Sequence, residues 1–301
     1  MSVSATMVRR AERYHVEHDT RYTYRVPVSQ SWQLAHLTPA TLPWQRVLAH
    51  DLAIEPTPDE RHERRDAFGN GVTHFGVHGP HPLLRVRMTC EVEIGDRGDP
   101  DAAAAIAWED VRESLHAAPA QDALRPARMA EPSTLVPWSD AARAYAAASF
   151  AAGRDWLDAV GELMRRIHRE FEFEPGTTTV TTSVDEVLAQ RSGVCQDFAH
   201  VMIACLRSHG LPARYVSGYL LTEPPPGRPR LLGADVSHAW VAAYSPRHGW
   251  VEFDPTNDQL ADRRYITLAS GGDFADVVPL RGVILGGRGQ KMHVGVSVIP
   301  R

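Results

Sequence analysis

The stretch from Ser192 to Pro212 constrains the fold more than any other part of the sequence. It opens with the turn-prone pair Ser192-Gly193 and closes with Gly210-Leu211-Pro212, which is typical of a helix C-terminus. Between these turns, apolar residues recur at the spacing of one helix face: Val194, Phe198, Val201, Met202 and Cys205. The pattern predicts a helix with a buried face and with Cys195 in its first turn. Unpaired N–H groups and the positive end of the helix dipole favour a thiolate there, and one N–H group could face a developing oxyanion.

A β-hairpin is predicted about forty residues further on. Residues 238–244 and 250–254 are strand-like, and residues 245–249 between them have turn chemistry. If Tyr244 pairs with Trp250, Asp254 lies opposite Trp240, one diagonal step from His238. A loop shorter by one residue on each side puts Asp254 directly opposite His238. In both registers the two side chains share a face of the sheet, so the carboxylate can reach the imidazole.

Cys195, His238 and Asp254 are a chemically sufficient set for nucleophilic catalysis. A thiol is a weak nucleophile until a base takes its proton, and the base works best when a third group fixes its tautomer. We therefore predict Cys195 as nucleophile, His238 as general base and later acid, and Asp254 as the orienting carboxylate. Without these neighbours, a lone cysteine at a helix start would more often be structural. The other two cysteines, Cys90 and Cys205, are expected in the core.

Several motifs resemble the bacterial transglutaminase-like superfamily, a group of proposed cysteine proteases. They are Gly-Val-Cys-Gln-Asp-Phe-Ala-His (193–200), Gly-Leu-Pro-Ala-Arg-Tyr-Val-Ser-Gly-Tyr (210–219), Ser-His-Ala-Trp-Val (237–241) and Asp-Pro-Thr-Asn (254–257). Residues 66–71 and the strands around them are similar to the family's N-terminal β region, and residues 265–282 also resemble its tail. The resemblance implies a papain-like core, in which the nucleophile helix packs on an antiparallel sheet that carries the histidine and the aspartate.

The resemblance also implies a reaction. The thiolate would attack an amide or peptide carbonyl, release an amine or ammonia, and leave a thioester that water or a second amine resolves. Water gives a protease or amidase, whereas an amine gives a transglutaminase. No residue decides between them. Gln196-Asp197 stands where animal crosslinking transglutaminases have a tryptophan, and no calcium loop of alternating acidic residues is visible, so hydrolysis is placed first.

Two further readings stay open. Arylamine N-acetyltransferases use the same three residue types, but residues 191–195 (Arg-Ser-Gly-Val-Cys) depart from their Arg-Gly-Gly-Xaa-Cys motif. The other reading is a retired catalytic core that serves as a scaffold or binding module. The expected partner is a peptide or protein substrate. The family resemblance adds ATP-grasp and α-E proteins as associated partners.

Other candidate site residues are weaker. Gln190, five residues before the nucleophile, is a candidate second oxyanion donor, and Trp240 and Asp197 are candidates for the substrate groove. His200 is on the helix of Cys195, but five helical residues rotate it away, so it is expected to be structural. His78 and His81 have no convergent ligands, so no metal and no other cofactor is expected.

Along the chain we expect an α+β organisation in three parts. Residues 1–95 read as an antiparallel β-sandwich, residues 96–150 as a helical connection, and residues 151–301 as the catalytic domain with C-terminal strands. The polar, proline-rich residues 222–230 read as a loop at the rim of the site. The formal charge of −5 shows no broad basic face, which argues against nucleic acid and membrane partners. Three widely spaced cysteines and the lack of an apolar leader indicate the cytoplasm.

Overall fold

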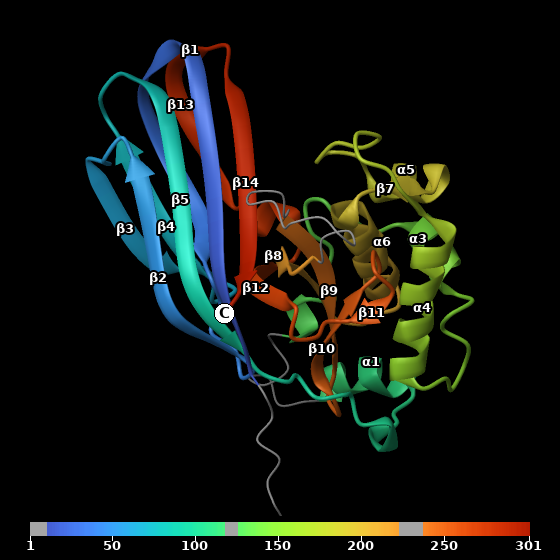
Figure 1. The fold of residues 1–301 in the computed structure, drawn as a ribbon. Helices are drawn as coiled ribbons and strands as arrows, with labels where there is room; N and C mark the ends of the chain where they lie inside the picture. The colour runs from blue at the N-terminus through green and yellow to red at the C-terminus, as the bar shows by residue number, and fades with distance from the viewer. Residues whose placement is uncertain (1–10, 118–125, 223–236) are drawn as a thin grey trace, which may run out of the picture.

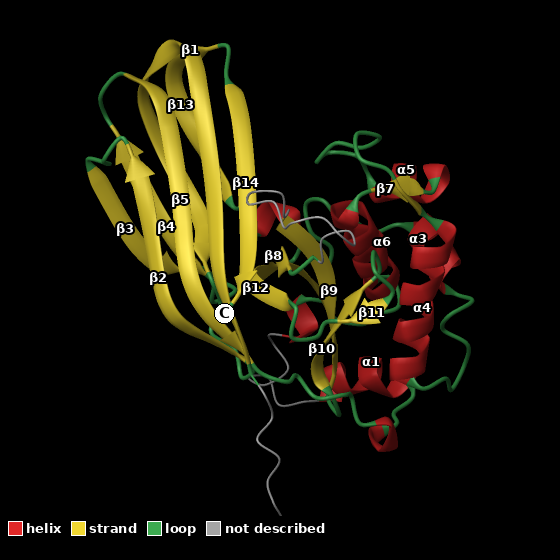
Figure 2. Ribbon diagram, viewed as in Figure 1, coloured by secondary structure: helices red, strands yellow, loops and turns green. Residues whose placement is uncertain are grey.

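The computed structural model describes residues 11–117, 126–222 and 237–301. Figure 1 shows a strand-rich region beside a region in which helices cover a smaller sheet. Figure 2 shows that the helices gather on one side of that smaller sheet, while the long strands lie on the other side. The molecule therefore has a layer of helices, a five-stranded sheet and a larger sheet.

The larger sheet is built around one long strand, β1 (Glu12–Thr38). Its first half pairs with β5 (His81–Ile94) and β14 (Lys291–Pro300), and its second half pairs with β4 (Gly71–Val77) and β13 (Leu280–Arg288). The edge strands are β2 (Gln45–Glu55), which pairs with β5, and β3 (Glu60–Arg65), which pairs with β4. All of these pairs are antiparallel, so residues from both ends of the chain complete one sheet.

Alternation along β5 explains how this sheet buries one face. Leu84, Val86, Met88, Cys90, Val92 and Ile94 are all buried, and the residues between them are partly exposed. This period of two is what a half-buried antiparallel strand requires. The expected core position of Cys90 follows from the same alternation.

The smaller sheet has the strand order β11-β10-β9-β8-β12. Its strands are β8 (Ala213–Leu220), β9 (Ser237–Ser245), β10 (Gly249–Asp254), β11 (Gln259–Leu260) and β12 (Tyr265–Gly271). The helices are α1 (Trp108–Ala117), α3 (Asp140–Ala146), α4 (Trp156–Glu170), α5 (Val184–Gln190) and α6 (Cys195–Arg207). The short elements are η1 (Ala102–Ala104), η2 (Phe274–Asp276) and a parallel pair, β6 (Glu172–Phe173) with β7 (Ser192–Gly193).

Both faces of the smaller sheet are buried. Ala239, Val241 and Ala243 of β9 belong to the core that α6 and the other helices form. On the opposite face, Tyr219 and Ile266 belong to the core of the larger sheet. The two sheets therefore share one apolar interior, and the predicted α+β class, with an antiparallel β region before a helix-on-sheet core, is confirmed.

The predicted three-part division of the chain stays a prediction. Val111, Ala142 and Ala146, from the stretch read as a helical connection, are buried in the core around α6. The last strands, β13 and β14, extend the larger sheet. None of the helices within the described residues is long and apolar enough to cross a bilayer.

Arg207, at the end of α6, joins segments that are far apart in the sequence. Its side chain is only 2% exposed and donates to the carbonyl oxygens of Met129 (3.0 Å), Ala213 (2.9 Å) and Gly272 (2.7 Å) and to Ser133 Oγ (3.0 Å). Burial lowers the pKa of its guanidinium to about 10, so the group is still charged at neutral pH. One buried cation thus joins the segment of Met129 and Ser133 to the start of β8 and to the residue that follows β12.

Arg207→Met should destabilise the protein strongly. The carbonyl groups of Ala213 and Gly272 lose their donor in a dry site, whereas that of Met129 keeps the N–H group of Ala213. Each unsatisfied group costs about 1 to 3 kcal/mol, so we expect a loss of at least about 2 kcal/mol. Urea unfolding followed by circular dichroism measures it. Arg169→Met is the matched control, because Arg169 on α4 is 66% exposed; we expect a change within about 0.5 kcal/mol there. Equal stabilities of the two variants would contradict this role of Arg207.

Candidate active site

Cys195 is the first residue of α6, and a tight turn holds it there. The N–H group of Val194 donates to Asp197 Oδ2 (2.8 Å), and the hydroxyl of Thr178 donates to the same oxygen (2.7 Å). A side chain on Gly193 would come within 2.7 Å of that oxygen, so only glycine fits. Burial raises the pKa of Asp197 against these hydrogen bonds. The predicted placement of the thiol in the first helical turn is therefore observed, with its backbone fixed from both sides.

The hairpin of β9 and β10 has the first of the two predicted registers. Trp250 pairs with Tyr244, and Phe253 pairs with Val241. Asp254 then lies one diagonal step from His238, and its Oδ2 is 2.7 Å from His238 Nε2. The imidazole and the carboxylate therefore meet on one face of the sheet.

His238 lies between Asp254 and Cys195. The carboxylate holds Nε2, so Nδ1 is the ring nitrogen left for the thiol of Cys195, which is near enough to raise the pKa of the histidine. Burial alone would lower the pKa of His238, but the hydrogen bonds and charges of Asp254 and Cys195 outweigh it and raise the pKa to about 10. The structure thus brings the three residues together in the order thiol, imidazole, carboxylate.

Asp254 is fully buried and is held by more donors than the sequence indicated. Asn257 Nδ2 and the hydroxyl of Tyr265 donate to Oδ2 at 2.7 and 2.6 Å, and the N–H group of Thr256 donates to Oδ1 at 2.8 Å. Burial alone would raise the pKa of Asp254, yet hydrogen bonds from His238, Asn257 and Tyr265 hold it below its ordinary value. The carboxylate is therefore ionised and fixed in place.

Sequence reasoning missed Asn257 and Tyr265. The sequence did offer a signal for Asn257, because this residue ends the Asp-Pro-Thr-Asn motif. In the structure its Nδ2 lies 3.3 Å from His238 Nε2. Tyr265 comes from β12, at the far edge of the sheet from β10, and no local signal marks it. Its hydroxyl pKa is raised by burial and by the charge of Asp254. It therefore stays a hydrogen-bond donor at all ordinary pH values.

The weaker candidates are engaged in other contacts. Trp240 is fully buried, stacks beside His238 with ring centroids 6.0 Å apart, and donates from its indole to Glu252 Oε2 (2.7 Å). Asp197 is 2% exposed and caps α6, so neither residue offers open surface to a groove in this arrangement. Gln190 is exposed and donates to the carbonyl of Ser192 (2.9 Å). Its role as an oxyanion donor stays a prediction.

The remaining titratable groups near α6 are structural. His200 accepts a hydrogen bond from the N–H group of Phe274 (3.2 Å), and burial lowers its pKa to about 4.

In the described part of the chain, no group of three or more His, Cys, Asp or Glu residues could hold a metal ion. Most of the stretch predicted as a rim loop, residues 223–230, lies outside the described residues.

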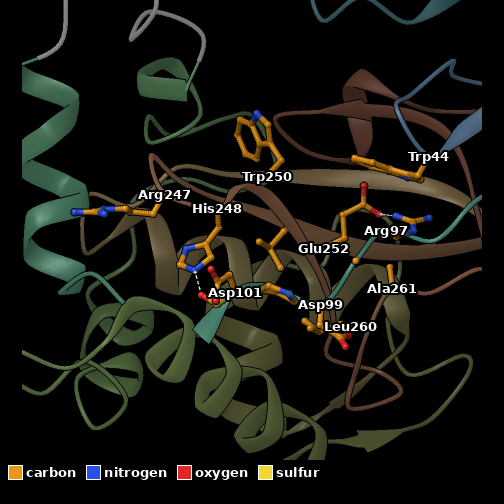
Figure 3. A pocket seen from close by; sticks show the side chains of 13 residues that line it. Trp44, Arg97, Asp99, Asp101, Arg247, His248, Trp250, Glu252, Leu260 and Ala261 are labelled. Atoms are coloured by element: carbon orange, nitrogen blue, oxygen red, sulfur yellow. Dashed lines mark hydrogen bonds and ion pairs between the residues drawn. The ribbon is translucent and has the colours of Figure 1, made fainter. Parts of the chain in front are cut away.

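Two pockets lie at opposite ends of the β9 and β10 hairpin. One, of about 240 Å³, is lined by the Arg97–Glu252 ion pair, Trp44 and His248 near the hairpin turn (Figure 3). The other, of about 260 Å³, is lined by His238 itself and by residues of β1 and β14. Of these two, only the second is lined by one of the three predicted catalytic residues, His238.

Two family models match the chain. Residues 14–93 match the bacterial transglutaminase-like N-terminal region, and residues 143–255 match the transglutaminase-like superfamily. An uncharacterized protein of Mycobacterium tuberculosis is 41% identical, covering 96% of this chain and 93% of that protein. A protein-glutamine gamma-glutamyltransferase of Pseudomonas aeruginosa is 34% identical over 108 residues, which are 35% of this chain and 16% of that enzyme.

A solved structure has the same fold. The crystal structure of a "Putative Cysteine Protease from Cytophaga hutchinsonii" superimposes with a TM-score of 0.74 at 22% identity, covering 96% of this chain and 91% of that one. At this identity the likeness concerns the fold alone. The two matched family models and the Mycobacterium tuberculosis relative show that the chain belongs to the transglutaminase-like superfamily.

Proposed function

We propose that this protein is a thiol-dependent hydrolase of peptide, isopeptide or amide bonds, with Cys195, His238 and Asp254 as its catalytic triad. The observation that carries the proposal is the placement of His238 between the thiol of Cys195 and the buried carboxylate of Asp254. A raised histidine pKa beside a thiol at a helix N-terminus favours the thiolate–imidazolium pair, the reactive form of a cysteine nucleophile.

The proposed reaction has two halves. The Cys195 thiolate attacks the carbonyl carbon, and the N–H group of Cys195 at the helix start stabilises the oxyanion. The imidazolium of His238 gives its proton to the leaving nitrogen as the C–N bond breaks, which leaves a thioester. Neutral His238 then takes a proton from water, whose oxygen attacks the thioester, and the acid product leaves as the thiolate re-forms. Asp254 keeps Nε2 protonated throughout.

An amine in place of water would give a transglutaminase. The observation that favours this second candidate is the 34% identity over 108 residues with the Pseudomonas aeruginosa protein-glutamine gamma-glutamyltransferase. The two candidates share the thioester and differ only in the group that resolves it. The proposed compartment is reducing and cytoplasmic, since the three cysteines in the described residues are all free thiols.

Selective alkylation tests the proposed nucleophile. With one equivalent of iodoacetamide at pH 7, we expect Cys195 to be modified first, because burial raises the pKa of Cys90 and of Cys205 to about 12. His238→Ala should slow this labelling by about 100-fold or more, within the range of general acid–base effects. Intact mass and peptide mapping measure both. Equal labelling of the three cysteines would overturn the proposal.

His248→Ala is the matched control for His238→Ala. His248 lies at the turn of the same hairpin, stacked on Trp156, and should leave the labelling rate unchanged. Turnover is then followed on glutamine-containing peptides, by ammonia release without added amine and by incorporation of a fluorescent primary amine. Cys195→Ala should abolish both signals. Amine incorporation that outruns hydrolysis would select the transglutaminase.

The raised pKa of His238 predicts an alkaline limit to turnover. The free enzyme carries the imidazolium below its pKa of about 10 and loses it as the pH rises through that value, so kcat/KM for an amide should fall above about pH 10. Alkylation by iodoacetamide needs no proton donor and should not fall there. Asp254→Asn removes a group that raises this pKa, so the limit should move to lower pH. A limit that stays at the same pH in Asp254→Asn would contradict the assignment.

A further inference from the structure

The cavity beside His238 has one wall from each sheet. His238, Ser217 and Ser237 come from the smaller sheet, and Tyr22, Met292 and Val294 come from the larger one. Tyr22 pairs with Met292, and Thr20 pairs with Val294, so these side chains stand on the same face of neighbouring strands. The strands β1 and β14 therefore form part of the surroundings of the candidate active site.

The wall from the larger sheet is apolar and open. Met292 is 61% exposed and Val294 is 41% exposed, and Leu280 and Val278 continue the apolar lining. Exposed apolar surface gains free energy when it is covered, at roughly 25 cal/mol per Å². Such surface beside a reactive thiol favours a ligand that carries an apolar group.

Two polar side chains of this wall, His18 and Thr20, already have hydrogen-bond partners. His18 Nδ1 is 2.9 Å from the hydroxyl of Tyr219, and His18 Nε2 is 2.9 Å from Thr20 Oγ1. Burial lowers the pKa of His18 to about 4, so its ring is neutral at ordinary pH. The other polar groups of the lining are the hydroxyl of Tyr22 on the larger sheet and Ser217, Ser237 and His238 on the smaller sheet.

We propose that this cavity is a specificity subsite that binds an uncharged apolar side chain of the acyl donor, next to the amide that Cys195 attacks. The inference rests on the proposed function and adds the substrate class. At about 260 Å³ the cavity is smaller than most small-molecule sites, which start at about 300 Å³, so it suits one side chain rather than a whole ligand. The serines on the catalytic side suit the polar backbone of the same substrate.

Such a subsite would give the β-strand region a direct part in catalysis. Binding energy from a part of the substrate that does not react can hold the reactive amide against the nucleophile. Two elements more than 250 residues apart in the sequence, β1 and β14, would together select the substrate.

Alkylation by a homologous pair of reagents tests the subsite on the full chain. Iodoacetamide and N-hexyl iodoacetamide react alike: the sulfur of Cys195 bonds to carbon, the C–I bond breaks and iodide leaves. Each rate is divided by the rate of the same reagent with free glutathione. We then expect N-hexyl iodoacetamide to react about tenfold faster than iodoacetamide, because several of its methylene groups are buried in the cavity. Its rate should also level off as the reagent concentration rises.

Met292→Glu should reduce this preference to near unity, because it places a charge in the apolar wall. Met292→Gln is the uncharged second variant and should lower the preference less. Val283→Glu is the matched control: Val283 is a 65% exposed apolar residue on β13 outside the cavity, and the preference should be unchanged there.

The outcomes separate the subsite from the proposed function. Selective, His238-dependent labelling of Cys195 without preference for the hexyl reagent, or with a preference that Met292→Glu leaves intact, would overturn the subsite alone. Loss of selective Cys195 labelling by both reagents would overturn the proposed function and the subsite with it.

Discussion

The buried carboxylate of Asp254 is the constraint on which the rest of the site depends. An ionised carboxylate without contact to water is costly unless hydrogen bonds replace its hydration. Here the donors are the side chains of a histidine, an asparagine and a tyrosine and two backbone N–H groups, and they come from β9, β12 and the turn after β10. Because every donor must be in place, the carboxylate fixes the register of the hairpin and the position of β12 along with the imidazole.

The larger sheet packs on the face of the smaller sheet opposite the helices and so supports this arrangement. Tyr265, which donates to Asp254, begins β12, and the next residue on β12, Ile266, is buried in the core shared with the larger sheet. Gly218, opposite His238 on β8, has no room for a side chain, since an added carbon would come within 2.1 Å of the Ile266 carbonyl oxygen. The strands from the two ends of the chain are thus part of the same packing unit as the candidate triad.

Local chemistry made part of this structure predictable. The helix α5 (Val184–Gln190) is specified locally, because Ser183 and Glu186 form a capping box and apolar residues follow at helical spacing. The turn after Tyr244 left two hairpin registers open, both with His238 and Asp254 on one face, and the structure has the one in which Tyr244 pairs with Trp250. By contrast, the pairing of β13 and β14 with β1, and the contacts of Tyr265 and Arg207, join segments that are distant in sequence. Such contacts depend on packing across the whole fold, which no local period records.

Asp254 and Cys195 both raise the pKa of His238, but only Asp254 does so throughout the proposed reaction. In the free enzyme the thiolate and Asp254 both favour the imidazolium, and burial opposes it. Once the sulfur of Cys195 has bonded to the carbonyl carbon in the tetrahedral intermediate, its charge and its hydrogen bond are gone, whereas Asp254 and the burial remain. The pKa of His238 must then fall, so the imidazolium becomes a better proton donor to the leaving amine as soon as the sulfur has attacked, before the C–N bond breaks. After that transfer the ring is a neutral base, available to water or to an amine. A strongly raised resting pKa is therefore compatible with turnover, because the reaction itself removes one of its causes.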